Sequence, residues 1–329
     1  MFKGIVPAKS FRLAVAIFIL LLILPPFVPR FFVYILALIY VTSLLAMSLN
    51  LLVGHGGMFQ FHHAVFYGVG AYTVALILTK ARLPFWVGFL AGPIVAAIVG
   101  LGIGWFCVRL TRLYFGMLQI SLGSLVWAIV FRWYSFTGGD DGIHGIPMPP
   151  ILSSLNRSYY FILIILAISL MVLYLILKSP FGSTLQAIRD NPDRCAAVGI
   201  NVRHHQLLAI LIGTFFAGMA GVLFVVLERS VFPDLLFWVL SLEIFIMCLL
   251  GGWFTFAGPI LGAAITVGLR TFVGIYTEYW TLILGIILIL LIFFLPEGVM
   301  GYFLEISKSR PKEAAEGRES IGAPGGRSR

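Results

Sequence analysis

The sequence predicts an all-α integral membrane protein with about ten transmembrane helices. Hydrophobic residues make up 60% of its 329 residues, charged residues only 11%, and the mean hydropathy is +1.05. A soluble globular chain is roughly 25% charged, so lipid must surround most of this one. Apolar runs of about 20 residues, the length that crosses a bilayer, recur from Phe11 to Leu295. A membrane β-barrel would need short alternating segments, and the run from Tyr159 to Leu177 shows no alternation.

Ten candidate spans follow one another along the chain. The first has a basic lead like that of a signal peptide, but Pro25, Pro26 and Pro29 replace the small residues of a cleavage site, so we expect it to be retained. The third and ninth spans each follow a Gly-rich break, and together the spans define one transmembrane domain over residues 1–304. Their ranges are 11–29, 31–53, 64–79, 84–108, 113–136, 158–177, 206–227, 236–250, 257–276 and 279–296.

The basic residues predict which side of the membrane each loop faces. With the N-terminus inside, fifteen Lys and Arg lie in inner segments and five in outer ones, and such an excess marks the cytoplasmic side. Both termini are therefore expected in the cytoplasm. Residues 305–329 have no apolar face to bury, so we expect a disordered basic cytoplasmic tail. The net charge of +9 then reflects membrane orientation and contact with lipid, and we expect no binding of nucleic acid.

The sequence carries no pattern for catalysis, nucleotide binding or a metal. Cys107, Cys195 and Cys248 form no CxxC pair. Adjacent histidines on a helix point about 100° apart, so His62 and His63 are not expected to share a metal. A Gly-x-x-x-x-Gly-Lys-Ser/Thr loop is absent, as are a nucleophilic serine motif and a two-His zinc helix. We expect no metal, no cofactor bound by this chain and no enzymatic activity; any ATP and Mg must be bound by partner subunits.

The stretch from Gly54 to His63 is too rich in glycine and polar residues to continue an ordinary lipid-facing helix. Lipid cannot satisfy backbone groups that leave a helix, so protein or a water-filled cavity must do so. We therefore place this break on a pathway for a solute, facing a solvated cavity. Tight helix packing through Gly68, Gly70 and Ala71 is the alternative, and the two are compatible. The pathway residues assigned as a hypothesis are Gly56, Gln60, His62, His63, Gln119, Glu243 and Gly252.

A six-residue pattern occurs twice. Gly56-Gly57-Met58-Phe59-Gln60-Phe61 recurs as Gly251-Gly252-Trp253-Phe254-Thr255-Phe256, each time before a helix rich in small residues. Six spans separate the copies, so both have the same orientation. A pseudo-twofold internal repeat would place a pathway at the repeat interface. Chance likeness in a chain rich in Gly and Phe is the alternative.

The segment 178–205 is the only long loop on the inner side. Ser183 and Gln186 are spaced as a capping box, which predicts a helix running to about Asp190. Asn191 can cap a second helix from Pro192 to Val198, with Gly199 as its left-handed stop. A helix of roughly 10 Å suits a groove on another protein. The alternative is a connector that binds lipid headgroups through its arginines.

Acidic residues occur at two further places, in an outer loop and within a predicted span. The outer loop Thr137–Pro147 contains Asp140 and Asp141 among glycines, which permit sharp turns near a ligand or partner, although a plain surface turn fits equally. Glu243 lies within the eighth span, where an unpaired charge costs at least about 2.5 kcal/mol. Arg270 is its candidate partner. Glu243 either lines the pathway, where it meets the amino group of a solute, or belongs to a structural ion pair between helices.

Several segments in order resemble the LivM-type permeases of branched-chain amino acid ABC importers. The likeness covers about residues 35–301. The segments are His63-Ala64-x-Phe66-x-Gly68-x-Gly70-Ala71-Tyr72, Tyr114–Leu118, Thr137–Pro147, Leu185–Asn191, Ala196–Asn201, Leu250–Gly252, Gly258–Ala263 and Leu295–Gly298. Departures from the family pattern are His62, Phe59, Phe254 and Phe256, where the family usually has Gly, Leu or other small residues, and Cys195, where it commonly has an acidic or small one. They bear on the solute rather than on the transporter class.

The resemblance implies a permease subunit in the bacterial inner membrane that carries branched-chain amino acids or a related small solute. It implies as partners a second homologous permease, two cytoplasmic ATPase subunits and a periplasmic substrate-binding protein. The inner loop then becomes the ATPase docking site, with Arg189, Asp190, Arg194, Ala197, Gly199 and Asn201 as its residues. An ion-coupled secondary transporter is the alternative, with Glu243 and Arg270 as coupling charges.

Overall fold

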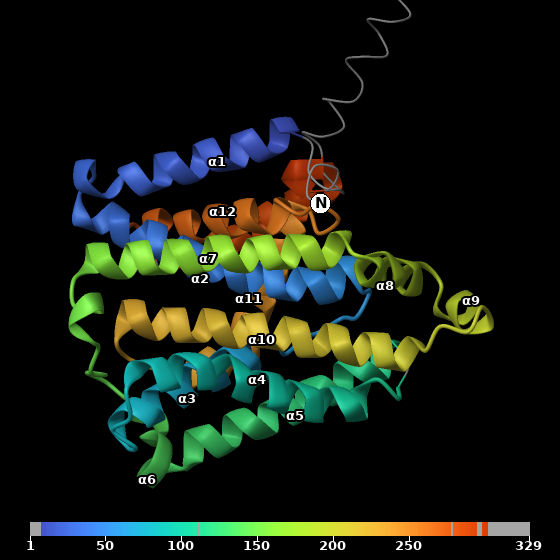
Figure 1. Ribbon diagram of the computed structural model, residues 1–329, viewed down its shortest axis with the longest axis horizontal. Coiled ribbons are helices and arrows are strands. Elements are labelled where there is room, and N and C mark those ends of the chain that lie inside the picture. The colour runs from blue at the N-terminus through green and yellow to red at the C-terminus, as the bar shows by residue number, and fades with distance from the viewer. Residues whose placement is uncertain (1–7, 111, 278, 295–297, 302–329) are drawn as a thin grey trace, which may run out of the picture.

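The computed structural model describes residues 8–110, 112–277, 279–294 and 298–301. The long helices lie roughly side by side, with α8 and α9 at one end of the bundle and α6 at the other (Figure 1). Following the predicted orientation, we call these the inner end and the outer end. The predicted tail, residues 305–329, lies outside the described residues.

Each predicted span overlaps one main helix. These are α1 (Ala8–Ile23), α2 (Arg30–Asn50), α3 (Ala64–Thr79), α4 (Phe85–Cys107), α5 (Arg112–Arg132), α7 (Leu155–Lys178), α10 (Val202–Glu228), α11 (Trp238–Gly251), α12 (Gly258–Val273) and α13 (Trp280–Phe294). Short helices lie in the loops: α6 (Tyr134–Thr137), α8 (Pro180–Asp190) and α9 (Pro192–Ala197). Single turns complete the set: Pro25–Phe27, Leu51–His55, Gly139–Asp141, Pro150–Leu152 and Pro233–Leu236. In the described part of the chain the only β pairing is an isolated bridge between Ile143 and Val231.

Five of these helices are long and apolar enough to cross a membrane, judged by length and composition. They are Arg30–His55, Phe85–Cys107, Leu113–Arg132, Leu155–Lys178 and Val202–Glu228. Helices α3, α11 and α12 are apolar but have only 16, 14 and 16 residues. At about 1.5 Å per residue, none of the three reaches 30 Å. An all-α membrane architecture is therefore confirmed, whereas the number of crossings stays a prediction.

Helices α2 and α10 form the centre of the bundle. In the α10 span 72% of the most apolar window is buried, against 22% in the α5 span, so α5 lies at the periphery. Backbones approach closely around α10, because a Cβ on Gly221 would lie 2.0 Å from the Tyr67 carbonyl oxygen. A Cβ on Gly70 would lie 2.3 Å from the Gly218 carbonyl oxygen. Tight packing through the small residues of α3 is thus confirmed.

The outward side chains of the peripheral helices are mostly large and apolar. Because exposing such a surface to water is unfavourable, lipid or another apolar protein face must cover it. Examples from α4, α5 and α7 are Leu90, Ile94, Ile98, Leu113, Met117, Leu125, Ile129, Ile164 and Ile168.

Candidate functional site

The two Gly-rich breaks meet inside the bundle. After α2, the chain makes one π-helical turn, Leu51–His55, and stays out of regular helix until Ala64. The second break joins α11 to α12. Asn50 Nδ2 donates to the Thr255 carbonyl at 3.5 Å, and a Cβ on Gly54 would lie 2.2 Å from the Trp253 carbonyl oxygen. The helix breaks are confirmed and in direct contact, and the internal repeat stays a prediction.

Several backbone N–H groups of the first break donate hydrogen bonds to other groups of the protein. The Gly57 N–H donates to the Val53 carbonyl at 3.1 Å, and the Met58 N–H donates to the Leu52 carbonyl at 2.9 Å. The Ala64 N–H donates to Ser241 Oγ of α11 at 2.9 Å. These bonds satisfy three of the backbone N–H groups at this interruption, as a break inside an apolar bundle needs.

His63 anchors the start of α3. Its Nδ1 lies 2.6 Å from Gln60 Oε1, and its Nε2 lies 2.8 Å from Ser48 Oγ on α2. Gln60, His62 and His63 are all buried, and the expectation that this segment faces a solvated cavity stays a prediction. His62 and His63 also lie in a turn ahead of α3 rather than on a helix. Among the described residues no group of three His, Cys, Asp or Glu could hold a metal.

Helix α5 covers the break through a glycine-lined face. A Cβ on Gly123 would lie 2.6 Å from His62 Cγ, and a Cβ on Gly116 would lie 2.7 Å from Phe61 Cδ2. Gln119 lies between the two glycines in sequence and is also buried. Spacings of three and four residues put all three on one face of the helix. We call this contact between α5 and residues 59–63 the α5 seam.

Two polar side chains at the α5 seam have no hydrogen-bond partner within the described protein. Both ring nitrogens of His62 and both amide atoms of Gln119 are unpaired, although each side chain is about 1% exposed. A buried polar group without a partner costs about 1–3 kcal/mol. Polar groups of a solute entering here would relieve that cost, and α5 is the least buried of the five long spans. The seam is therefore the best candidate for a pathway.

Glu243 and Arg270 form the ion pair that the sequence predicts. Arg270 Nη1 lies 3.8 Å from Glu243 Oε2, and their side chains are 59% and 16% exposed. Helices α11 and α12 are close enough for this because glycines line their contact: a Cβ on Gly251 would lie 1.8 Å from the Gly258 carbonyl oxygen.

The inner loop folds as two short helices, with one change from the prediction. Ser179, not Ser183, caps α8, because Pro180 occupies its first position. The Ser183 hydroxyl instead donates to the Ser179 carbonyl at 3.4 Å. Asn191 Oδ1 accepts from the Arg194 N–H at 2.9 Å, which confirms the predicted cap of α9.

The end of the second short helix also follows the prediction. Gly199 has φ +89° and ends α9 in the left-handed region. Arg194, Ala197 and Gly199 are exposed on α9 or just after it. Asn201 Oδ1 accepts from the His204 N–H at 3.1 Å and so caps α10.

Arg189 turns toward the interior of the protein rather than standing free for a partner. Its Nη1 donates to the Gly54 carbonyl at 2.8 Å, and its Nη2 lies 2.9 Å from Asp190 Oδ1. Its guanidinium carbon lies 5.2 Å from the centre of the Phe254 ring. We therefore correct the expectation that Arg189 is available to an ATPase. No local sequence pattern signals a contact across 135 residues.

The outer loop is pinned to the α10–α11 connection. Ile143 and Val231 exchange two backbone hydrogen bonds, each 2.9 Å. Gly142 has φ +70°, and a Cβ there would lie 2.1 Å from the Val231 carbonyl oxygen, so the turn requires glycine. Asp140 and Asp141 are exposed, as a docking or surface role requires.

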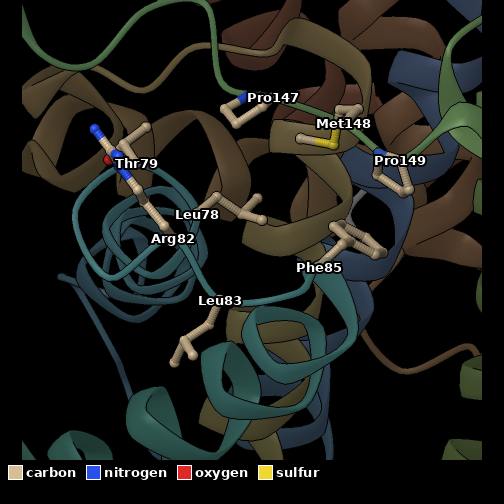
Figure 2. A pocket seen from close by; sticks show the side chains of 8 residues that line it. All are labelled: Leu78, Thr79, Arg82, Leu83, Phe85, Pro147, Met148 and Pro149. Carbon is tan, nitrogen blue, oxygen red and sulfur yellow. The ribbon is translucent and has the colours of Figure 1, made fainter.

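A shallow hollow of about 610 Å³ opens beside this loop. In Figure 2, Pro147, Met148 and Pro149 face Leu78 and Phe85 across it. The other lining residues are Thr79, Arg82 and Leu83. None of the eight belongs to the predicted pathway. The hollow lies at the far end of α3 from the break, about 24 Å away along 16 residues of helix.

The known proteins that resemble this chain are permeases of branched-chain amino acid transport systems. The family model described as "Branched-chain amino acid transport system / permease component" matches residues 31–292. The high-affinity branched-chain amino acid transport system permease protein LivM of Escherichia coli is 28% identical, covering 91% of this chain and 78% of its own length. The probable branched-chain amino acid transport permease protein LivM of Methanocaldococcus jannaschii is 26% identical, covering 80% and 90%. The permease protein LivH of Escherichia coli is 22% identical, covering 79% and 91%. No solved structure matches the chain.

Proposed function

The chain belongs to the family of branched-chain amino acid transport permease components, and from this premise we propose that it is the membrane-spanning permease subunit of an ATP-driven ABC importer. The solute is a branched-chain amino acid or a related small molecule, and the membrane is the bacterial inner membrane with both termini in the cytoplasm. The observation that carries the proposal is the pair of Gly-rich breaks meeting inside an apolar bundle, with unpaired polar side chains where α5 covers the first break.

The solute passes along the α5 seam. His62 and Gln119 offer hydrogen bonds to its polar groups, since neither spends its bonding capacity on the protein. Gly56, Gln60 and His63 frame the first break, and Gly252 belongs to the second. A site that binds through hydrogen bonds alone holds a polar solute without binding it so tightly that release fails, as conduction through membranes requires. Movement of α5 away from the break opens the pathway, and its low burial favours that movement.

The partners are proposed from the resemblance and from the exposed surfaces. The named relatives include both LivM and LivH permeases, which supports pairing with a second homologous permease. Helix α9 exposes Arg194 and Ala197 at the inner end, and Gly199 is exposed just after it. Two cytoplasmic ATPase subunits dock at this end and supply ATP and Mg. Asp140 and Asp141 at the outer end face a periplasmic substrate-binding protein. This chain performs no covalent step.

One observation favours a second candidate function. The Glu243–Arg270 pair joins α11 to α12, and ionisable pairs on membrane helices can couple solute movement to protons or sodium. An ion-coupled secondary transporter would then need no ATPase subunit.

Reconstitution separates the two candidates. We expect vesicles containing this chain, the second permease and the ATPase subunits to take up labelled leucine only with ATP inside and the binding protein outside. Vesicles containing this chain alone, given a proton or sodium gradient, serve as the comparison. Gradient-driven uptake by the chain alone would replace the ABC permease with the carrier.

A further inference from the structure

Arg189 touches three segments that are distant in the sequence. It belongs to the last turn of α8, bonds the Gly54 carbonyl at the first break and lies over the Phe254 ring of the second break. The two breaks also contact each other directly at Gly54 and Trp253. One side chain thus joins the inner loop to both interruptions of the bundle.

The chemistry of this contact favours arginine. Nε and Nη2 both donate to Asp190 Oδ1, at 3.0 and 2.9 Å, while Nη1 is left to donate to Gly54. Only a planar fork with several donors can hold both acceptors at once, and a lysine ammonium has no such geometry. Carbonyls in the last turn of a helix lack partners within it and carry partial negative charge, so Gly54 favours a cation.

The first break is shaped around the stem of this side chain. Gly57 has φ +65°, and a Cβ there would lie 2.7 Å from Arg189 Cγ. Glycine therefore serves both the backbone turn and the close approach. Phe254 is 60% exposed, so its ring contributes to this contact more than to the core.

The place of Arg189 in the loop suits the transmission of movement. Leu185 and Ile188 of α8 are buried against the bundle, whereas α9 projects beyond it at the inner end (Figure 1). Arg189 directly precedes Asp190 and Asn191, where the chain turns from α8 into α9. A pull on α9 therefore reaches Arg189 within a few residues.

We propose that Arg189 is a positioning residue that links movement of the inner loop to both Gly-rich breaks, so that a partner pulling on α9 reshapes the break that α5 covers. This inference rests on the proposed function. It assigns Arg189 to coupling within the permease and leaves docking of the ATPase to α9.

The test compares Arg189→Gln, Arg189→Lys, Phe254→Leu and the double variant Arg189→Gln/Phe254→Leu in the complete importer. The measured quantity is leucine uptake per ATP hydrolysed, together with the amount of ATPase subunit that copurifies. Arg203→Gln is the matched control, because it removes an exposed positive charge on the same side without touching either break. We expect Arg189→Gln to lower the ratio roughly tenfold, as loss of a charge-assisted hydrogen bond predicts. Arg189→Lys should recover part of the lost ratio. Arg203→Gln should keep the wild-type ratio.

The outcomes separate the possible roles. A purely structural role would lower uptake and hydrolysis together and leave their ratio unchanged, which overturns the proposal. Loss of copurifying ATPase would make Arg189 a docking residue and also overturn it. Phe254→Leu should lower the ratio less, and the double variant no further than Arg189→Gln, because the two residues share one contact. If Arg189→Gln does not fold, wild-type ratios for Arg189→Lys and Phe254→Leu contradict the proposal. A wild-type complex without ATP-driven uptake would instead refute the proposed function.

Discussion

The His62 ring lies against Gly123 so closely that a Cβ added to Gly123 would be 2.6 Å from Cγ of the ring. This contact fixes how closely α5 approaches the first break. Since the ring nitrogens have no hydrogen-bond partner in the protein, this contact is where the proposed pathway can be tested.

Gly123→Val should block transport. The added side chain fills the space beside the His62 ring that the solute would need, and such overpacking costs about 1–3 kcal/mol. We expect normal insertion and a loss of leucine uptake in reconstituted vesicles. Gly102→Val on α4 is the matched control, because a Cβ there meets nothing within 4 Å. Equal uptake by the two variants would remove α5 from the pathway.

His62→Leu and Gln119→Leu should separate stability from transport. Their polar atoms have no protein partner, so an apolar replacement leaves stability unchanged or raises it. Uptake should fall in both variants because the solute loses its hydrogen bonds. Thermal stability in detergent and uptake are measured on the same preparations.

His63→Leu provides the contrast. It breaks the contacts with Gln60 and Ser48, so it should destabilise the protein by about 1–3 kcal/mol. If His62→Leu melted as early as His63→Leu, His62 would be a structural residue and not part of the pathway.

The Glu243–Arg270 pair should behave as a structural ion pair. Glu243→Ala removes the carboxylate that lies 3.8 Å from Arg270 Nη1, and removing one partner of an ion pair should weaken the contact between α11 and α12. We expect less protein in the membrane for the single variant, and recovery of both amount and uptake in Glu243→Arg/Arg270→Glu. An exchanged pair that inserts normally but does not transport would make Glu243 a pathway carboxylate. Full activity of Glu243→Ala would exclude both roles.

Gly199→Val should uncouple ATP hydrolysis from transport. A Cβ at Gly199 meets nothing within 4 Å, so the change acts only through φ +89°. Valine in such a conformation costs of order 1–3 kcal/mol, which distorts the end of α9. Gly199→Asn is the control, since Asn tolerates left-handed backbone better. Wild-type uptake per ATP in the valine variant would argue against α9 as the coupling element.

Local signals in the sequence predict most of the fold. Apolar runs placed α7 and α10 within a few residues of their observed ends, because lipid sets the length of each run. Asn191 before Pro192 identified the start of α9. The start of α8 was wrong because two capping signals compete, and Pro180 favours Ser179 over Ser183.

Contacts across the chain explain what the sequence could not reveal about the site. His62 and Gln119 were assigned to the pathway, yet no pattern within one sequence pairs His62 with Gly123. Gln60 and His63 are polar, which is typical of a segment exposed to water. In the structure they instead form a buried hydrogen-bond network with Ser48. The polar character of a segment does not say whether water or protein satisfies it.

Three hydrogen-bond partners of the first break are synthesised late. Ala64 bonds Ser241, Asn50 bonds Thr255 and Gly54 bonds Arg189, which are 177, 205 and 135 residues further along the chain. A ribosome that has delivered only α1 to α7 into the membrane therefore leaves these three groups without their partners. The half-made protein cannot close around its own interruption until α11 and α12 arrive. We therefore expect chains truncated before α11 to be degraded rather than accumulate as a stable half-permease.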